Sequence, residues 1–251
     1  MAQSPVLKAR GLSVTRGTRT VIQKLDLEIF QEDIVCFVGE NGSGKTTLIE
    51  SLVGIIPLTK GRVEWFSEKD EPLIIRNYSG TRQKPHPFGL TLQSDGVCGE
   101  EKVTERLITA LNVSGIDCSQ LEAKQILEEW GMSHRGEDSV SQLSAGLRRR
   151  LAVISGMAPA MMCETPRLVF LDEPSEGLDS FSKGVLKKWI SELSQYGNAI
   201  VIASHDEEII ACSSRILTIE SGEISESKNN IEKDSNMERQ FLSERETTTI
   251  S

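Results

Sequence analysis

The sequence predicts an α/β fold in which a mostly parallel core sheet carries an antiparallel β subdomain and an α-helical lobe. Strand-like apolar runs alternate with helical patterns from residue 34 onward, which is typical of a parallel sheet. The first 30 residues instead alternate polar and apolar positions, as strands with one solvated face do. A helix-rich stretch at about 94–160 separates two sets of strands, so we expect a separate lobe there.

The first part of the chain is predicted to be mainly β. Residues 6–14 and 21–29 show the half-polar alternation of an antiparallel edge. The run "IVCFVG" at 34–39 is continuously apolar, which indicates a buried strand, and a helical segment at 48–55 follows a glycine-rich turn. Short strands are expected in "RVEWF" and "FGLTL", whereas most of residues 67–102 show no clear element.

Helices and strands alternate in the rest of the chain. Ser119, with Glu122 three residues on, forms a capping box that predicts a helix running to Trp130. An apolar i, i+4, i+7 spacing over 147–154 predicts a later helix that ends before Pro159. The other expected elements are a helix near 103–112, the strand "RLVFL", a helix that carries Leu186, Ile190 and Leu193 and stops at Gly197, the strand "AIVIAS", the short helix "DEEIIAC" and the strand "RILTI".

The C-terminal segment differs in composition from the rest. From Ser221 the chain is polar and mostly aperiodic, which predicts a flexible tail over 221–251. We therefore expect one domain over 1–220, with the helical lobe inserted at about 94–160.

Composition excludes several classes of protein. The 251 residues carry a formal net charge of −9, which repels phosphate backbones, so no nucleic-acid partner is expected. The chain has neither an apolar run of about 18 residues nor a signal-peptide-like N-terminus, and it is not expected to span a membrane by itself. Its five cysteines are widely spaced without a CxxC pair, which favours a reducing, cytosolic compartment over a zinc or disulfide framework.

The stretch "GENGSGKT" at 39–46 fits the phosphate-binding pattern G-x-x-x-x-G-K-[ST]. It follows a buried strand and opens a helix, so backbone amides and the helix dipole would face an anion. Lys45 would reach the β and γ phosphates of a nucleotide, and Thr46 would offer its hydroxyl to magnesium. The predicted contacts are Gly39, Glu40, Asn41, Gly42, Ser43, Gly44, Lys45, Thr46 and Thr47.

A second motif, "LVFLDEP", places Asp172 and Glu173 at the end of a buried strand. Open α/β sheets hold their chemistry at this end of their strands. In a P-loop enzyme the first carboxylate positions magnesium, and the second can orient and deprotonate the attacking water.

With these motifs the sequence resembles the nucleotide-binding subunits of ATP-binding cassette (ABC) proteins, along residues 6–220. "LSAGLRRR" at 143–150 looks like the family's signature motif, and "SEGLD" at 175–179 looks like its D-loop. His205 in "IASHDEE" is similar to the switch histidine, and Gln93 in "LTLQSDG" is similar to the Q-loop glutamine. The resemblance implies a P-loop NTPase fold of ABC type.

The resemblance also implies roles for individual residues. Glu173, His205 and Gln93 would be catalytic, with ATP as the nucleotide. Thr46 and Asp172, together with Gln93, would hold Mg²⁺.

A dimer is implied as well. Family members close the γ-phosphate of ATP with the signature helix of a second subunit, so hydrolysis needs two subunits. Ser144 and the amides of Ala145 and Gly146 would supply the closing donors at a helix N-terminus.

The sequence departs from the family pattern at three places. Ala145 and Leu147 replace a glycine and the glutamine of the signature, so the loop must avoid positive φ at Ala145. The aromatic residue that often stacks on adenine is missing near "SVTRG", and the Arg16 guanidinium is expected there instead. The stretch 67–92 has no clear match. Because the apolar face of their helix is core, Arg148 and Arg149 are expected on or near the exposed dimer surface.

The function expected from these features is ATP binding and hydrolysis in an ABC transporter. The subunit would dimerise around two ATP molecules with a second copy or a homologous ATPase subunit, and would drive separate membrane-spanning transporter subunits. It would be cytoplasmic and peripheral on the inner face of the cell membrane, and "LSAGLRRRLAV" looks closest to exporter-type subunits.

Two alternatives remain at this point. One is a soluble ABC ATPase without a transporter, acting in iron-sulfur assembly, translation or DNA repair; those that act on nucleic acid usually carry duplicated cassettes, long insertions or a basic surface, which are not evident here. The other is a P-loop kinase or GTPase, which would have no use for a signature helix or a switch histidine.

Overall fold

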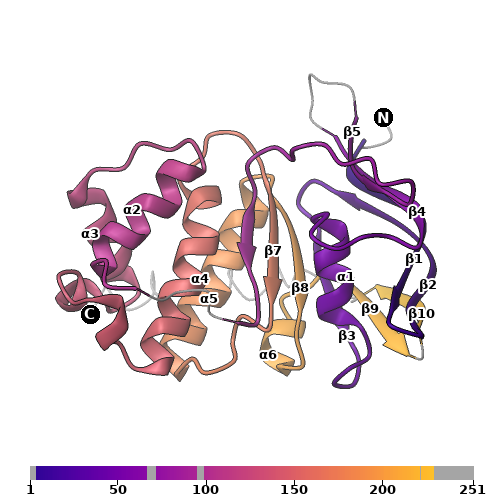
Figure 1. Ribbon diagram of the computed structural model, residues 1–251. Coiled ribbons are helices and arrows are strands. Elements are labelled where there is room, and N and C mark those ends of the chain that lie inside the picture. Colours follow the sequence, from indigo (N-terminus) through magenta and orange to yellow (C-terminus); the bar gives the residue numbers. More distant parts are fainter. Residues whose placement is uncertain (1–3, 67–71, 95–98, 221, 229–251) are drawn as a thin grey trace, which may run out of the picture.

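The computed structural model describes residues 4–66, 72–94, 99–220 and 222–228. This part of the chain forms two sheets, with helix α1 (Lys45–Leu52) between them and the long helices on the far side of the larger sheet (Figure 1). The architecture is the α/β class that the sequence predicts, with a mixed, mostly parallel sheet and an antiparallel β subdomain.

The smaller sheet is antiparallel and has the strand order β2-β1-β4-β5. Leu7 and Ile29 on its inner face are fully buried, whereas Lys8 and Glu28, opposite each other on the outer face, form an ion pair of 2.7 Å. The alternation in the first 30 residues therefore does separate a dry face from a wet one. The strands are β1 (Pro5–Arg16), β2 (Arg19–Phe30), β4 (Lys60–Trp65) and β5 (Leu73–Asn77), the last lying where the sequence indicated no element.

The larger sheet has the order β10-β9-β3-β8-β7-β6, in which only the β10–β9 pair is antiparallel. Because five neighbouring strands run in one direction, their carboxyl ends meet along one edge of the sheet. The strands are β3 (Ile34–Val38), β6 (Gly89–Thr91), β7 (Leu168–Asp172), β8 (Ala199–Ala203), β9 (Arg215–Glu220) and β10 (Glu223–Lys228).

The central strands separate two apolar cores. Phe37 and Phe170 face α1 and pack in one core with Leu48, whereas Cys36 and Leu171 face the other core, under the long helices. Successive residues of a strand point to opposite faces, so a strand buried on both sides must be apolar at nearly every position. This is why β3, β7 and β8 have continuous apolar sequences rather than alternating ones.

The helices on the far face begin and end largely as the sequence predicts. The capping box forms: the Ser119 hydroxyl accepts a hydrogen bond from the Glu122 amide at 3.2 Å, and the Glu122 carboxylate accepts one from the Ser119 amide at 2.8 Å. The helices are α2 (Val103–Val113), α3 (Gln120–Glu129), α4 (Ala145–Met161), α5 (Ser180–Gln195) and α6 (Glu207–Ile210), with short 3-10 turns η1 (Ser133–Arg135) and η2 (Val140–Gln142).

The predicted end of α4 before Pro159 was wrong, since the helix continues through Pro159 to its end at Met161. Pro159 lies in the last turn, where its missing N–H removes a single bond to the carbonyl of residue 155. The flanking residues Ala158 and Ala160 are at most 2% exposed, so stopping the helix earlier would take them out of the core.

The start of the predicted flexible tail was also wrong. Strand β10 pairs with β9, with Ile224 opposite Ile219, and so covers the edge of the larger sheet. Residues 229–251, the rest of the predicted tail, lie outside the described part of the chain. None of the helices that are described is both long and apolar enough to cross a bilayer.

Helix α4 approaches β6 closely at two glycines. A Cβ on Gly156 would overlap the Thr91 hydroxyl and lie 2.6 Å from the Leu90 carbonyl oxygen, and a Cβ on Gly89 would lie 2.5 Å from the Gly156 carbonyl oxygen. The contact places α4 directly against the strand that leads to Gln93.

We predict opposite effects from adding a methyl group at two helical glycines. Gly156→Ala should lower the free energy of unfolding by about 1–3 kcal/mol, because the contact with β6 would be overpacked. Gly184→Ala, at an exposed position of α5 with open space around it, should raise that free energy by about 0.5–1 kcal/mol. Urea unfolding at 25 °C measures both; equal stabilisation by the two substitutions would contradict the close approach.

Candidate functional site

The glycine-rich segment 39–47 connects β3 to α1 at the carboxyl edge of the larger sheet and includes the first three residues of the helix. Gly44, at the N-terminus of α1, has φ +118°, and a Cβ there would lie 2.7 Å from a Val21 methyl carbon. Only glycine adopts this conformation without strain, and only glycine fits against β2. The turn directs the first amides of α1 toward the space above the sheet, as an anion-binding helix N-terminus requires.

Lys45 is held over this turn. Its Nζ donates to the carbonyl oxygens of Gly39 at 2.9 Å and Glu40 at 3.4 Å, and it lies 3.8 Å from Glu173 Oε1. The side chain is only 7% exposed. The ammonium is therefore fixed between the glycine-rich turn and Glu173, with its positive charge at the N-terminus of α1.

Asp172 ends β7 and is completely buried. Neither carboxylate oxygen has a hydrogen-bond partner of good geometry among the described residues. Burial raises the pKa of Asp172, an effect only partly opposed by the Thr46 hydroxyl and by the positive charges of Arg149 and Lys45.

The surroundings of Asp172 fit a magnesium ion. The Asp172 carboxylate and the Thr46 hydroxyl offer the oxygen ligands that Mg²⁺ prefers. The part of the chain that the structure describes holds no group of three or more acidic, histidine or cysteine side chains that could form an all-protein metal site. The donor set therefore suits an ion that keeps phosphate oxygens and water as its other ligands.

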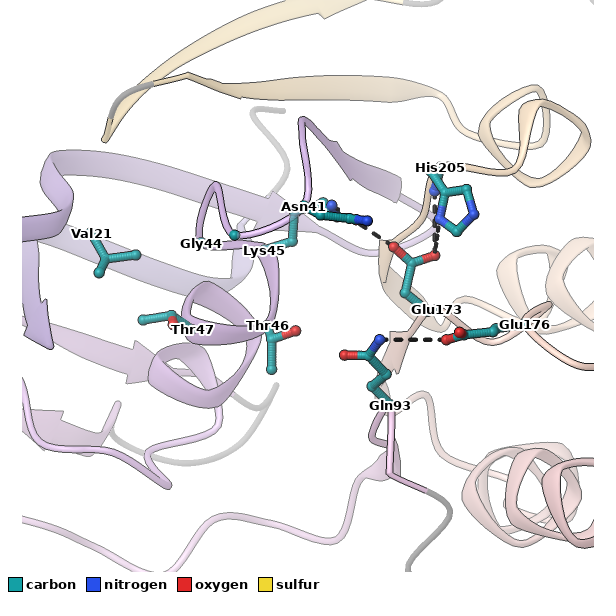
Figure 2. A pocket seen from close by; sticks show the side chains of 11 residues that line it. Val21, Asn41, Gly44, Lys45, Thr46, Thr47, Gln93, Glu173, Glu176 and His205 are labelled. Atoms are coloured by element: carbon teal, nitrogen blue, oxygen red, sulfur yellow. Dashed lines mark hydrogen bonds and ion pairs between the residues drawn. The ribbon is translucent and has the colours of Figure 1, made fainter. Parts of the chain in front are cut away.

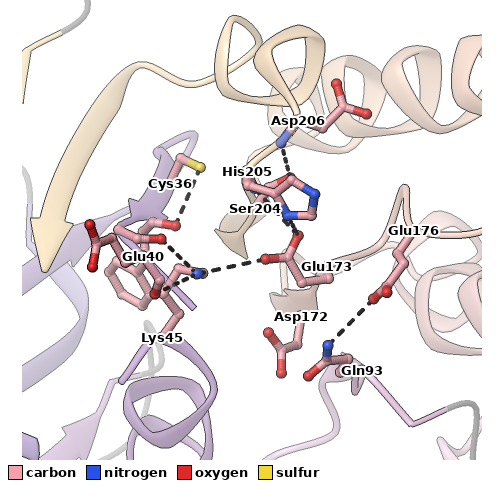
Figure 3. A network of polar contacts seen from close by, with 12 residues as sticks. Cys36, Glu40, Lys45, Gln93, Asp172, Glu173, Glu176, Ser204, His205 and Asp206 are labelled. Atoms are coloured by element: carbon pink, nitrogen blue, oxygen red, sulfur yellow. Dashed lines mark hydrogen bonds and ion pairs between the residues drawn. The ribbon is translucent and has the colours of Figure 1, made fainter. Parts of the chain in front are cut away.

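Glu173 and His205 form a pair at the ends of neighbouring strands (Figure 3). Glu173 Oε2 lies 2.9 Å from His205 Nδ1 and accepts a hydrogen bond from the His205 amide at 3.3 Å. The Glu173 backbone is left-handed, with φ 47°, and its amide donates to the Ala203 carbonyl at 2.8 Å. Glu173 is buried, whereas the His205 side chain is 68% exposed, so the histidine is the member of the pair that faces solvent.

A cavity of about 480 Å³ joins these groups (Figure 2). On its far wall Gln93 Nε2 donates to Glu176 Oε2 at 3.4 Å. The lining residues are Val21, Asn41, Gly42, Gly44, Lys45, Thr46, Thr47, Gln93, Glu173, Glu176 and His205. The structure therefore brings together the glycine-rich segment, Glu173, His205 and Gln93, which the sequence singled out separately.

The cavity also contains residues that sequence reasoning missed. Val21 comes from β2 and had no motif to mark it, although its contact with Gly44 brings it into the wall. Glu176 was part of the predicted "SEGLD" turn but was given no role of its own. Cys36, whose thiol is drawn above Lys45 in Figure 3, lies outside the lining. It is buried, and burial raises its pKa to about 12, so it stays a protonated thiol.

The signature residues lie apart from this cavity. Ser144 caps α4 by accepting from the Leu147 amide at 3.3 Å, and Ser144 and Ala145 are exposed. Ala145 is the first residue of the helix and has no positive φ, as expected for alanine. A Cβ on Gly146 would lie 3.2 Å from the Gly177 carbonyl oxygen, so this helix start adjoins the "SEGLD" segment.

Arg16 is also outside the cavity lining. It lies at the end of β1, and its guanidinium is paired with the carboxylate of Glu50 on α1. Val21, rather than Arg16, is the residue of the β1–β2 hairpin that lines the cavity.

The expectation that Arg149 is exposed was wrong. Arg149 is 4% exposed, and its guanidinium donates to four backbone carbonyl oxygens on the inner side of α4. Three consecutive helical residues span about 200° around the axis, so with α4 packed on two sides one arginine of the run must face inward. The small residues Ala152 and Gly156, at i+3 and i+7 from Arg149, were the available signal for this second packed face.

Arg148 and Arg150 are half-buried. Arg148 donates to the Leu143 carbonyl oxygen at 2.5 Å, and Arg150 donates to the Trp130 carbonyl oxygen at 3.0 Å and to Asp179 Oδ2 at 2.9 Å. Each arginine of the run therefore has a different set of partners.

Comparison with known proteins gives a consistent result. Residues 22–176 match the profile of the ABC transporter family. The chain is 30% identical over 207 residues to the ergothioneine transport ATP-binding protein EgtV of Helicobacter pylori (strain G27), covering 81% of this chain and 91% of that protein. It is 31% identical over 225 residues to the zinc import ATP-binding protein ZnuC of Halorhodospira halophila (strain DSM 244 / SL1), covering 89% of this chain and 77% of that protein.

Solved structures show the same fold. An ATP-binding subunit of an ABC transporter aligns with a TM-score of 0.72 at 19% identity, covering 96% of this chain and 98% of that one. A dimeric ATP-binding cassette in a post-hydrolysis state with ADP and phosphate aligns with a TM-score of 0.73 at 18% identity, covering 88% of this chain and 98% of that one.

We predict that Asp172 destabilises the nucleotide-free protein. Because its folded-state pKa is raised, the ionised carboxylate favours unfolding at pH 7, and this cost fades as the pH falls through the folded-state pKa. Asp172→Asn should therefore raise the urea midpoint at pH 7, and its advantage over the wild type should shrink on acidification.

Asp33→Asn is the control for this prediction. The Asp33 carboxylate accepts a hydrogen bond from Arg215 at 2.6 Å, so its neutralisation should lower the urea midpoint instead. A lower midpoint for Asp172→Asn at pH 7 would refute the assignment of Asp172 as a buried charge that its neighbours compensate only in part.

Proposed function

The chain belongs to the ABC transporter family as an ATP-hydrolysing ATP-binding subunit, and we propose that two such subunits close around two ATP molecules to drive separate membrane-spanning subunits. The partner ATPase would be a second copy or a homologous subunit. One observation carries this proposal: the pocket contains Lys45, Glu173 and His205, whereas Ser144 and Ala145 are exposed and outside it. The signature residues of one subunit are therefore available to the nucleotide of another.

In the proposed nucleotide site the amides of residues 39–47 surround the phosphates and Lys45 contacts the β and γ phosphates. The left-handed turn at Gly44 and the burial of Lys45 support this assignment. Val21 lines the same space, and we propose that adenine stacks near it. The Arg16 guanidinium, which pairs with Glu50 outside the lining in this structure, would leave that pair to become the planar neighbour of adenine.

Thr46, Asp172 and Gln93 are the residues we propose as direct or water-mediated contacts of Mg²⁺, which when bound neutralises charge on the phosphates. The buried carboxylate of Asp172, which has no hydrogen-bond partner of good geometry among the described residues, supports this proposal best. Gln93 lies across the pocket from the glycine-rich segment, and we propose that its side chain lies near the γ-phosphate of the bound nucleotide.

For hydrolysis we propose Glu173 as the general base. Its carboxylate would accept a proton from the water that attacks the γ-phosphorus, the bond from that phosphorus to the bridging oxygen would break, and ADP and phosphate would leave. His205 is held against Glu173 Oε2 at 2.9 Å and would contact the γ-phosphate with its other nitrogen. Orphan amides at the N-terminus of the partner's signature helix would stabilise the charge on the transferred group.

The cellular setting follows from this proposal. A subunit that drives membrane-spanning partners would lie at the inner face of the cell membrane, in the cytoplasm. We propose one domain that includes β10 and so extends to about residue 228, with the helical lobe at about 94–160 inserted in it; this lobe and the residues around Gln93 would face the membrane partner. Export is the direction we propose, from the exporter-like "LSAGLRRRLAV"; the relatives above are named for transport and for import.

The role of Glu173 can be tested by Glu173→Gln. This variant should bind ATP and form a more stable nucleotide-bound dimer, while turnover falls by about 10²–10⁴-fold because the base is lost. Phosphate release and size-exclusion chromatography with ATP measure the two effects. Glu192→Gln, which neutralises a half-buried carboxylate of α5 that pairs with Lys188 away from the cavity lining, should keep turnover within about twofold; wild-type turnover in Glu173→Gln would remove Glu173 from the base role.

The composite site can be tested by mixing two inactive variants. Ser144→Arg should block the signature and Lys45→Ala the phosphate site, so each homodimer should be inactive. An equal mixture should recover up to about a quarter of the wild-type turnover, because half of the dimers are mixed and each has one intact site. Absence of recovery in a mixture shown to contain mixed dimers would contradict a site shared between subunits.

A further inference from the structure

Arg149 links two segments that meet at the wall of the pocket. It lies in the second turn of α4 and is 4% exposed. One guanidinium nitrogen, Nη1, donates to the carbonyl oxygens of Leu92 at 2.7 Å and Gln93 at 3.3 Å. The other, Nη2, donates to the carbonyl oxygens of Asp172 at 2.9 Å and Glu173 at 2.7 Å.

The two pairs of carbonyls belong to segments far apart in the sequence. Leu92 and Gln93 follow β6, whereas Asp172 ends the neighbouring strand β7 and Glu173 follows it. The ladder between β6 and β7 stops at the pair Thr91 and Leu171, so the guanidinium continues the connection beyond the last paired residues. It does so at the point where both segments leave the sheet and enter the pocket wall.

Glu173 needs such a support. Its backbone is left-handed, with φ 47°, a conformation that non-glycine residues adopt at a cost and that persists only when the surroundings hold it. Its carbonyl accepts from Arg149 and from the Glu176 amide at 3.1 Å, and its amide donates to the Ala203 carbonyl. Since φ and ψ at residue 173 set the direction of its side chain, these bonds determine where the carboxylate lies.

We propose that Arg149 is a positioning residue for Glu173, holding its carboxylate in line for hydrolysis and tying it to the backbone of the Gln93 segment. The inference rests on the proposed role of Glu173 as general base. A displacement of residues 92–93 would pull on the same guanidinium that holds residues 172–173, so a partner that moves Gln93 would also reposition Glu173.

The chemistry of the side chain supports this role. A guanidinium is planar and carries five N–H donors in a rigid fork, so it can serve carbonyls on two segments at once. A lysine ammonium is a compact point charge on a flexible stem and lacks that geometry. Helix α4, which carries Arg149, is itself packed closely against β6 at Gly156. The backbone from which the Arg149 guanidinium extends is therefore held rigidly.

The test uses Arg149→Gln and Arg149→Lys in the full chain, with ATP turnover, KM and nucleotide affinity measured for each. Both should lower kcat by about 10–100-fold. A displacement of a reacting group by about 1 Å can reduce the rate of the chemical step by about 100-fold. KM and the Kd for ATP should stay within about threefold, because the phosphate-binding residues are untouched. A fall in affinity that parallels the fall in kcat would indicate a merely structural residue and overturn the proposal, as would wild-type kcat in Arg149→Lys.

Arg167→Gln is the matched control. The Arg167 guanidinium also donates to a backbone carbonyl, that of Ser114 at 3.3 Å, but at the opposite end of β7. Its loss should change stability without changing kcat by more than about twofold. An equal drop in kcat from Arg167→Gln would show that any lost arginine bond near β7 has this effect, and would refute a specific role for Arg149.

A double-mutant comparison separates this inference from the function on which it rests. In a Glu173→Gln background, Arg149→Gln should not reduce the single-turnover rate further, because residues that act as a unit are not additive. A full additional 10–100-fold loss would show that Arg149 acts independently of Glu173. If Glu173→Gln alone kept wild-type turnover, the proposed base would fail; if it did not and the Arg149 variants were fully active, only the positioning role would fail.

Discussion

The register of three central parallel strands determines where the polar groups of the pocket lie. Phe37 of β3 and Asp172 of β7 both lie level with Ala203 of β8. The bonds just beyond this level continue the pattern: the Ser204 amide donates to Phe37 and the Glu173 amide to Ala203. The glycine-rich segment, the acidic pair and His205 thus leave the sheet together, and a slip of one residue would reverse the faces of a whole strand.

The pocket wall and the buried residues directly behind it concentrate features that oppose folding. Asp172 is a buried charge whose oxygens lack good partners, Glu173 is left-handed, and Arg149 buries a guanidinium against backbone carbonyls. Such features persist where the surrounding structure over-determines them. Here the strands beneath are packed on both faces, between α1 and the long helices, and that apolar framework holds the site in place.

Helix α4 connects the interior of the pocket wall to the surface that would meet a second subunit. Its first residues are exposed next to the "SEGLD" segment, its second turn contributes Arg149 to the inside, and its middle is fixed on β6 through Gly156. These parts belong to one continuous helix. A shift caused by a contact at its N-terminus would therefore reach the backbone of Glu173 through Arg149. This arrangement gives a physical route between occupancy of a shared site and the position of the proposed base.

What the sequence by itself determined was whatever is encoded within a short window. The glycine-rich segment is contiguous, Asp172 and Glu173 directly end an apolar run, and the capping box at Ser119 spans four residues. The dry and wet faces of the first strands and the doubly buried central strands also follow from local periodicity. The tertiary structure alone decided the partners that come from elsewhere: Arg149 is buried because α4 packs on two sides and carbonyls of β6 and β7 meet its fork, and Arg16 pairs with Glu50 on α1. It also decided that α4 continues past Pro159 and that β10 forms on the edge of β9, since in both cases packing with distant segments outweighs the local preference.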